Sequence, residues 1–158
     1  MHKITPCLWF DTEGEEAANF YTSVFPNSRI LDVTHYGEAG PRPAGTVMTV
    51  SFELDGQPFT ALNGGPEFTF SEAISFQVAC QGQDEVDHYW TRLAEGGEEG
   101  PCGWLKDSFG VSWQIVPTAL PELLGDPDPV MAQRVMTAML GMKKLDIAAL
   151  EEAAGGTS

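Results

Sequence analysis

The chain has 158 residues, of which 42% are hydrophobic and 20% are charged, so it is long and apolar enough to bury the core of one globular domain. Eight basic residues face 23 acidic ones, and the formal net charge is −15. A chain this acidic repels phosphate backbones and anionic lipid, which excludes nucleic acid and membranes from the expected partners.

The first half of the chain predicts a strand, a helix and three further strands. Ile4–Phe10 has the alternation of a strand, and Glu15–Val24 carries an apolar stripe at helical spacing. Thr12 and Glu15 have the spacing of a capping box, which would begin this helix. Strand-like stretches follow at residues 29–36, 46–54 and 57–63, with an Asp55-Gly56 turn between the last two.

The second half repeats this pattern in shorter form. Ile74–Cys80 predicts a strand, and Asp84–Leu93 predicts a helix with an apolar stripe. Residues 98–107 and 110–117 predict short strands, joined by a hairpin turn from Asp107 to Gly110. In the last strand we expect Trp113 to pack under the helix and Ser112 and Gln114 to face the other way. Each half therefore follows the order β-α-β-β-β.

The last 38 residues, 121–158, predict a tail of two helices. Asp128 followed by Pro129 is a typical start for the first helix, and Gly141 indicates its end. Asp146 would cap the second. Four of the six methionines lie in the tail, and such adaptable faces favour packing, a dimer contact or a partner protein.

A βαβββ module present twice resembles the vicinal oxygen chelate superfamily, also called the glyoxalase, bleomycin resistance and dioxygenase superfamily. The chain is most similar to its PhnB-like branch, labelled 3-demethylubiquinone-9 3-methyltransferase domain proteins. The stretches that carry the resemblance are "ITPCLWFDTEGEEAANFYTSVFPNSRI", "FTALNGGPEFTFSEAISFQV", "CGWLKDSFGVSWQIVP" and the tail "DPDPVMAQRVMTAMLGMKKLDIAALEEA".

The resemblance implies an α+β fold in which two tandem βαβββ modules form a curled mixed sheet around a cavity, often in a homodimer. We therefore expect a glyoxalase-like domain over residues 1–120, made of modules at about 1–66 and 72–120. A C-terminal helical tail over residues 121–158 would follow it.

Metal-using members of the superfamily hold a divalent ion with four side chains, one from the first and one from the last strand of each module. By the family's pattern and strand parity, these positions fall on Thr5, Asn63, Ser75 and Gln114. Two hydroxyls and two amides form a neutral set that lacks the imidazole and carboxylate ligands of catalytic metals. We therefore expect no metal and no cofactor.

Three residues are candidates for acid–base or nucleophilic chemistry, namely His35, Cys7 and Asp107. The direction of His35 is left open by its strand, and Cys7 is aimed inward by parity. The more general expectation for Cys7, Cys80 and Cys102 is that each is a small buried apolar residue. Their odd number and wide spacing predict neither a disulfide framework nor a structural zinc site. Whether the protein is an enzyme stays open.

Methyl transfer has no support in the residues, because no glycine-rich GxGxxG loop follows the first strand. The start of the chain lacks a signal-peptide pattern and no apolar run reaches the length of a membrane span, so we expect a cytoplasmic protein.

The expected ligand site combines an apolar wall with neutral hydrogen-bonding groups. The wall residues are Trp9, Phe59, Phe68, Phe70 and Trp104. The site as a whole is expected to contain Thr5, Cys7, Trp9, Asn63, Ser75, Gln77, Trp104 and Gln114. Because Lys106 is expected in a turn, this lining is neutral and predicts a small uncharged or weakly polar ligand. The expected function is therefore metal-free binding of a small molecule, with an enzyme in the same cavity or a partner-binding tail as alternatives.

Overall fold

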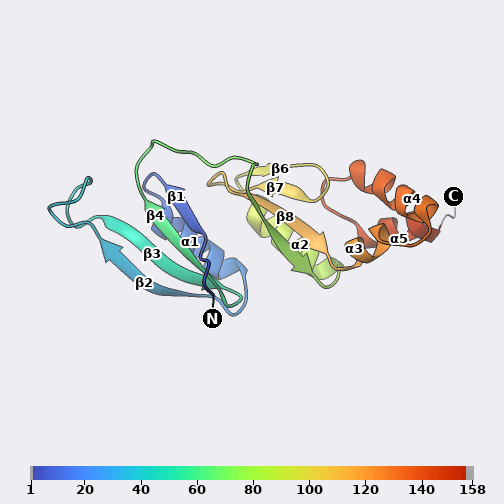
Figure 1. The fold of residues 1–158 in the computed structure, drawn as a ribbon, viewed down its shortest axis with the longest axis horizontal. Helices are drawn as coiled ribbons and strands as arrows, with labels where there is room; N and C mark the ends of the chain where they lie inside the picture. Colours follow the sequence, from blue (N-terminus) through green and yellow to red (C-terminus); the bar gives the residue numbers. More distant parts are fainter. Residues whose placement is uncertain (1, 156–158) are drawn as a thin grey trace. The chain divides into compact units, whose positions relative to one another are not determined.

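Residues 2–155, which the computed structural model describes, divide into two units between Phe70 and Ser71. The first unit contains β1 (Cys7–Phe10), α1 (Gly14–Val24), β2 (Arg29–His35), β3 (Val47–Leu54) and β4 (Gln57–Asn63) (Figure 1). Its strands form one sheet in the order β1-β4-β3-β2. Strand β1 runs parallel to β4, and the other neighbours are antiparallel.

Helix α1 packs on one face of the first sheet through its apolar stripe. Tyr21 is buried and stacks on Phe52 of β3, which in turn stacks on Phe59 of β4. Alternate residues of β1, Leu8 and Phe10, are also buried. The side of β1 that packs under the helix is therefore the side that strand parity predicts.

The capping box at the start of α1 is a wrong prediction. The helix begins at Gly14, and the residue before it, Glu13, makes no side-chain cap. Instead, the Gly14 backbone N–H donates to Oδ1 of Asn63 at 2.7 Å. A free N–H at a helix start needs an acceptor, and here β4 supplies it in place of Thr12.

The second unit repeats the arrangement of the first and adds the tail. It contains β5 (Ser75–Cys80), α2 (Gln83–Ala94), β6 (Glu98–Glu99), β7 (Trp104–Lys106) and β8 (Ser112–Pro117). Its strands form a second sheet in the order β5-β8-β7-β6, in which β5 is parallel to β8. The prediction of an α+β fold made of two βαβββ modules is confirmed.

Up to Gly155, the last residue that the structure describes, the tail has three helices where the sequence predicts two. They are α3 (Ala119–Leu124), α4 (Pro129–Leu140) and α5 (Ile147–Gly155). Helix α3 has only six residues and buries Leu120 alone, which is too short for a helical pattern to stand out in the sequence. The predicted caps are confirmed, because Asp128 accepts from Val130 N–H and Asp146 from Ala149 N–H.

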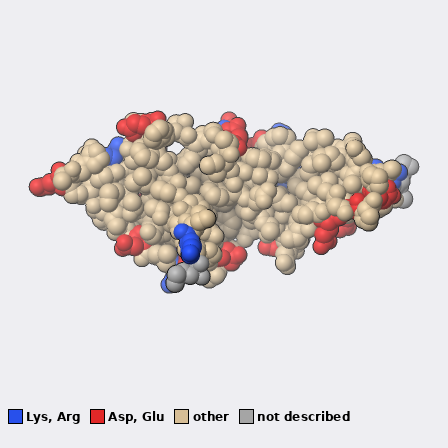
Figure 2. Space-filling view, viewed as in Figure 1, with Lys and Arg blue, Asp and Glu red and all other residues tan. Residues whose placement is uncertain are grey.

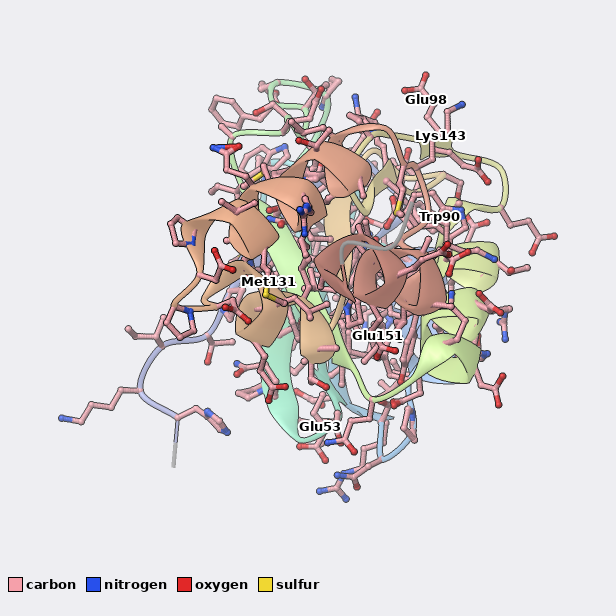
Figure 3. All side chains as sticks on the ribbon, turned by 90° about the vertical axis from the view of Figure 1, so that its right-hand side faces the viewer. Glu53, Trp90, Glu98, Met131, Lys143 and Glu151 are labelled. Carbon is pink, nitrogen blue, oxygen red and sulfur yellow. The ribbon has the colours of Figure 1, made fainter. Side chains whose placement is uncertain are left out.

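The methionines of the tail mostly pack inside it. A core of five buried residues joins the three helices and the chain between them: Leu120, Val135, Leu145, Leu150 and Ala154. Met131, labelled on α4 in Figure 3, is half-buried against this core, as are Met139 and Met142. Met136 is the exposed member of the α4 group, with 39% of its surface accessible. The tail therefore packs three of its four methionines on its own core, while Val130 and Leu140 of α4 are exposed.

Figure 2 shows acidic side chains at many separate places on the surface and few basic ones. Within residues 2–155, no helix has the length and apolar character needed to cross a membrane.

Candidate functional site

The candidate site lies on the face of the second sheet opposite α2, which we call the open face. Four of its residues lie side by side across all four strands, because Ser75 pairs with Ser112, Ser112 with Lys106, and Lys106 with Glu98. Directly paired residues present their side chains on the same face of a sheet, with Cβ atoms about 5 Å apart. We call these four residues the polar row.

A second row of three residues runs beside the polar row. Gln77 pairs with Gln114, and Gln114 pairs with Trp104. Nε2 of Gln114 donates to the Ser75 hydroxyl at 2.8 Å, and Nε2 of Gln77 approaches Oε1 of Gln114 at 3.4 Å. The predicted orientation of Ser75, Gln77 and Gln114 on the face opposite the helix is confirmed.

Lys106 changes the character of this face. It is the last residue of β7, so its predicted place in a turn is wrong. Its ammonium group lies 3.2 Å from Oε1 of Glu72, and the side chain is 33% exposed. The hydrogen bond and the charge of Lys106 hold the pKa of the Glu72 carboxyl below its usual range. The open face therefore carries a fixed cation, and the expected neutral lining is wrong.

A pocket of about 400 Å³ lies within the second unit, between the β6–β7 connection and the polar row. Most of its surface is apolar, and its lining residues are Glu72, Glu98, Glu99, Gly100, Pro101, Cys102, Trp104, Leu105, Lys106 and Ser112. Glu98, labelled in Figure 3, is exposed. Glu99 pairs with Leu105 and its carboxylate accepts from the Trp90 indole, so it belongs to the α2 side.

Ser112 stands out among the pocket residues. It is 1% exposed, and within residues 2–155 its hydroxyl oxygen has no hydrogen-bond partner. Leaving a buried hydroxyl unpaired costs about 1–3 kcal/mol, so such a group in a pocket lining is a candidate ligand contact.

The first unit brings together only part of the expected site. Trp9 faces away from α1, its indole N–H donates to the Gly65 carbonyl at 2.9 Å, and its ring meets Phe68 edge-on at 4.9 Å. Thr5 and Cys7 are exposed, and Thr5 precedes the strand, which begins at Cys7. The ring of Phe70 packs on that of Phe10, with 5.1 Å between the ring centroids.

Asn63 and Phe59 were expected to face the cavity, and both expectations are wrong for the same reason. The buried side of β4 comprises Phe59, Ala61 and Asn63, so these side chains face α1 rather than the predicted cavity. Besides accepting from Gly14, Asn63 donates from Nδ2 to the Val47 carbonyl at 3.2 Å. The predicted cavity face of β4 instead carries Leu62, which is paired with Trp9.

The side chains at the four family metal positions are poor ligands for a divalent ion. Asn63 is turned to the helix side and bonded to two backbone groups, while Ser75 and Gln114 are bonded to each other. Over the described residues, no cluster of three or more His, Cys, Asp or Glu side chains has the geometry of a metal site. The donors that remain are hydroxyl and amide groups, which bind divalent ions weakly on their own.

The structure also places the three candidates for acid–base chemistry. Asp107 is 2% exposed and accepts from the backbone N–H groups of Phe109 and Val111 and from the Trp113 indole. His35 is exposed at the end of β2, an edge strand. These two residues lie in different units.

The three cysteines are free thiols that differ in environment. Cys80 is buried as expected, and burial together with the charge of Glu85 raises its pKa to about 12. Cys7 is exposed, which contradicts the expectation of a buried residue, yet nearby protein atoms remove enough water to raise its pKa. Cys102 is half-buried in the turn before β7. A raised pKa leaves less of the reactive thiolate at neutral pH, which disfavours nucleophilic roles for Cys7 and Cys80.

Lys106, Glu98 and the pocket were missed from the sequence. The signal that could have found them is register: once Trp104 pairs with Gln114 across a hairpin that closes at Asp107, Lys106 must pair with Ser112.

Comparison with known proteins identifies one family. The sequence profile of 3-demethylubiquinone-9 3-methyltransferase matches residues 2–116. The chain matches none of the curated proteins. The solved structure of the PhnB protein from Bacillus cereus is 38% identical, with a TM-score of 0.67 over 74% of this chain and 100% of that chain.

Two more distant structures share the fold. A protein from Pseudomonas aeruginosa is 20% identical, with a TM-score of 0.62 over 74% of this chain and 98% of that one. The fosfomycin resistance protein FosX from Mesorhizobium loti is 13% identical, with a TM-score of 0.56 over 80% of this chain and 100% of that one. At these identities the likeness concerns the fold alone.

Proposed function

The chain belongs to the 3-demethylubiquinone-9 3-methyltransferase family, the PhnB-like branch of the vicinal oxygen chelate superfamily, and on that premise we propose that it binds a small, mostly apolar organic molecule without a metal. The binding site in this proposal is the open face of the second sheet with its pocket. The observation that carries it is the unpaired, buried Ser112 hydroxyl in the lining of a pocket of about 400 Å³. Pockets of this size with an apolar lining and a few polar groups are typical of small-ligand sites.

The arrangement of polar groups supports binding over turnover. Ser75, Gln77 and Gln114 form a short chain of hydrogen bonds that presents fixed amide and hydroxyl groups. Fixed neutral groups orient a ligand. Lys106, the basic group of the lining, is engaged in an ion pair with Glu72, which supports a role in binding rather than in proton transfer. The buried Asp107 carboxylate is engaged by three donors, which supports a structural role.

Methyl transfer finds no support in these residues, despite the family's name. A methyl donor of the nucleoside type is normally held at a glycine-rich loop between the first strand and the first helix of a parallel sheet. In this chain the corresponding connection reads Asp11-Thr12-Glu13, and only one strand pair in each sheet is parallel.

A homodimer in the cytoplasm is part of the proposal. Two large apolar side chains just before the edge strands are strongly exposed, Ile4 at 83% and Ile74 at 73%. Burying them against a second copy would remove apolar surface from water. The three free thiols are consistent with a reducing compartment.

Native mass spectrometry of protein purified without chelator tests the whole proposal. We expect a dimer mass, and an organic molecule of low mass that is released on denaturation. Elemental analysis of the same sample should find no stoichiometric divalent ion. One tightly held divalent ion per chain, lost in a Gln114→Ala variant, would overturn the metal-free site.

A further inference from the structure

We infer that the ligand of the open face is a monocarboxylate, whose head group replaces the Glu72 carboxylate on Lys106 and also reaches the Ser112 hydroxyl. This inference rests on the proposed function and names the chemical class of its ligand.

A carboxylate already binds the cation of the proposed head-group site, because Oε1 of Glu72 lies 3.2 Å from the Lys106 ammonium. The Glu72 side chain is 66% exposed, and it belongs to the turn that precedes β5. An exposed ion pair contributes little to folding, since water and salt screen it. A ligand carboxylate that also gains contacts inside the pocket can therefore displace Glu72.

Ser112 supplies the second contact for such a head group. It lies directly opposite Lys106 in the β7–β8 ladder, and its buried hydroxyl has no partner among residues 2–155. A carboxylate has two oxygens, so it can accept from the Lys106 ammonium and the Ser112 hydroxyl together. A neutral amide or an alcohol cannot form an ion pair with the Lys106 ammonium.

The rest of the pocket fits the apolar body of a small acid. Trp104 and Pro101 contribute lining next to Lys106, and the surface of the pocket is mostly apolar. An aromatic ring can pack against the indole of Trp104 while its acid group reaches the polar row.

The charge around the pocket limits the head group to a single negative charge. Lys106 is the one basic residue of the lining, and Glu98 is its direct neighbour in the polar row. Against a formal net charge of −15 for the chain, a phosphate or a dicarboxylate would meet more repulsion than one lysine offsets.

Three probes of similar shape test whether the site prefers a negative, a neutral or a positive head group: phenylacetate, phenylacetamide and benzylammonium. Each is titrated into the ¹⁵N-labelled full chain while amide and indole N–H signals are followed, with the Trp104 indole assigned from a Trp104→Phe variant. We expect phenylacetate to shift the signals of Trp104, Ser112 and Gln114, with at least about tenfold tighter binding than the other two probes.

Three variants test the two contacts. Lys106→Met keeps the apolar stem and removes the charge, so phenylacetate should bind at least about tenfold more weakly. Ser112→Ala should weaken binding about fivefold, and it should not unfold the protein because it removes an unpaired hydroxyl. Glu72→Gln should tighten binding about threefold, since it removes the competing carboxylate.

Lys144→Met is the matched control, because Lys144 also pairs with a partly exposed carboxylate, that of Asp87, at 2.8 Å, but outside the pocket lining. It should leave phenylacetate binding unchanged. Equal binding of the three probes at Trp104, or phenylacetate binding that survives Lys106→Met, would overturn the carboxylate while leaving the proposed function standing. Tighter binding of benzylammonium than of phenylacetate would also overturn the carboxylate and leave the proposed function standing. If none of the probes shifts the pocket signals at 10 mM, a concentration of about the order that weak fragments need, the site itself is wrong.

Discussion

The indole N–H of Trp113 donates to Oδ2 of Asp107 at 2.8 Å, and both residues are 2% exposed. The other carboxylate oxygen of Asp107 accepts from the backbone N–H groups of Phe109 and Val111. One buried carboxylate thus closes the hairpin and ties it to the core on the α2 side. Because Lys106 precedes Asp107 and Ser112 precedes Trp113, this contact also sets the spacing of the two proposed ligand contacts.

Replacing Asp107 with Asn should lower the free energy of unfolding by about 2 kcal/mol, because three donors then face a neutral and partly mismatched group. Urea unfolding followed by circular dichroism measures the change. A double-mutant cycle with Trp113→Phe should give a coupling above about 1 kcal/mol, since the two residues share one contact. Glu151→Gln, an exposed carboxylate on α5, is the control and should change stability by less than about 0.5 kcal/mol. A similar small effect of Asp107→Asn would contradict the structural role.

A second prediction compares Asn63 with Thr12, because the side chain that accepts the hydrogen bond at the start of α1 is that of Asn63. Asn63→Ala removes the acceptor of the Gly14 N–H and a donor to the Val47 carbonyl, and it should cost about 2–3 kcal/mol of unfolding free energy. Thr12→Ala should cost less than about 0.5 kcal/mol. Thermal and urea unfolding measure the stability of both variants. A larger loss of unfolding free energy in Thr12→Ala than in Asn63→Ala would support the capping box instead.

Gly64 lies so close to Trp9 that a larger residue forces either the indole or the loop of Gly64 to move. A Cβ atom at this position would lie 2.5 Å from the Trp9 ring, whereas one at Gly37 would meet nothing within 4 Å. Gly64→Ala should therefore destabilise the protein by about 1–3 kcal/mol and move the Trp9 indole signal in NMR spectra. Gly37→Ala is the matched control, for which we expect no shift of that signal. An unmoved Trp9 signal in Gly64→Ala would show that the loop yields instead of the ring.

Cys80 should make stability depend on pH in the alkaline range. Its pKa is raised from 9.0 to about 12 in the folded chain, so between these values the folded thiol keeps a proton that the unfolded thiol loses. Unfolding then releases a proton, and stability falls as the pH rises through this window. We expect Cys80→Ala to lose less stability than the parent between pH 8 and about pH 10.5, as measured by urea unfolding. Equal losses for the two proteins would contradict the raised pKa.

Strand alternation carried much of the prediction from sequence. It correctly divided β1 into Leu8 and Phe10 on the helix side and Trp9 on the other, and it did the same for β8. The alternation succeeds there because each strand buries one face against one helix, and side chains alternate strictly along a strand. It failed for Asn63, since parity alone says which residues share a face but not which face the helix covers.

The sequence by itself determined the order of helix and strands in the two modules, the hairpin from Asp107 to Gly110 and the caps Asp128 and Asp146, because residue alternation, turn residues and capping act over a few neighbouring residues. Only the tertiary structure decided that Asn63 starts α1, that Lys106 stands beside Ser112, and that the tail methionines pack on their own core. These contacts join residues far apart in the chain or across a ladder. Their partners are set by strand register and helix packing, which depend on the whole fold and not on any local pattern.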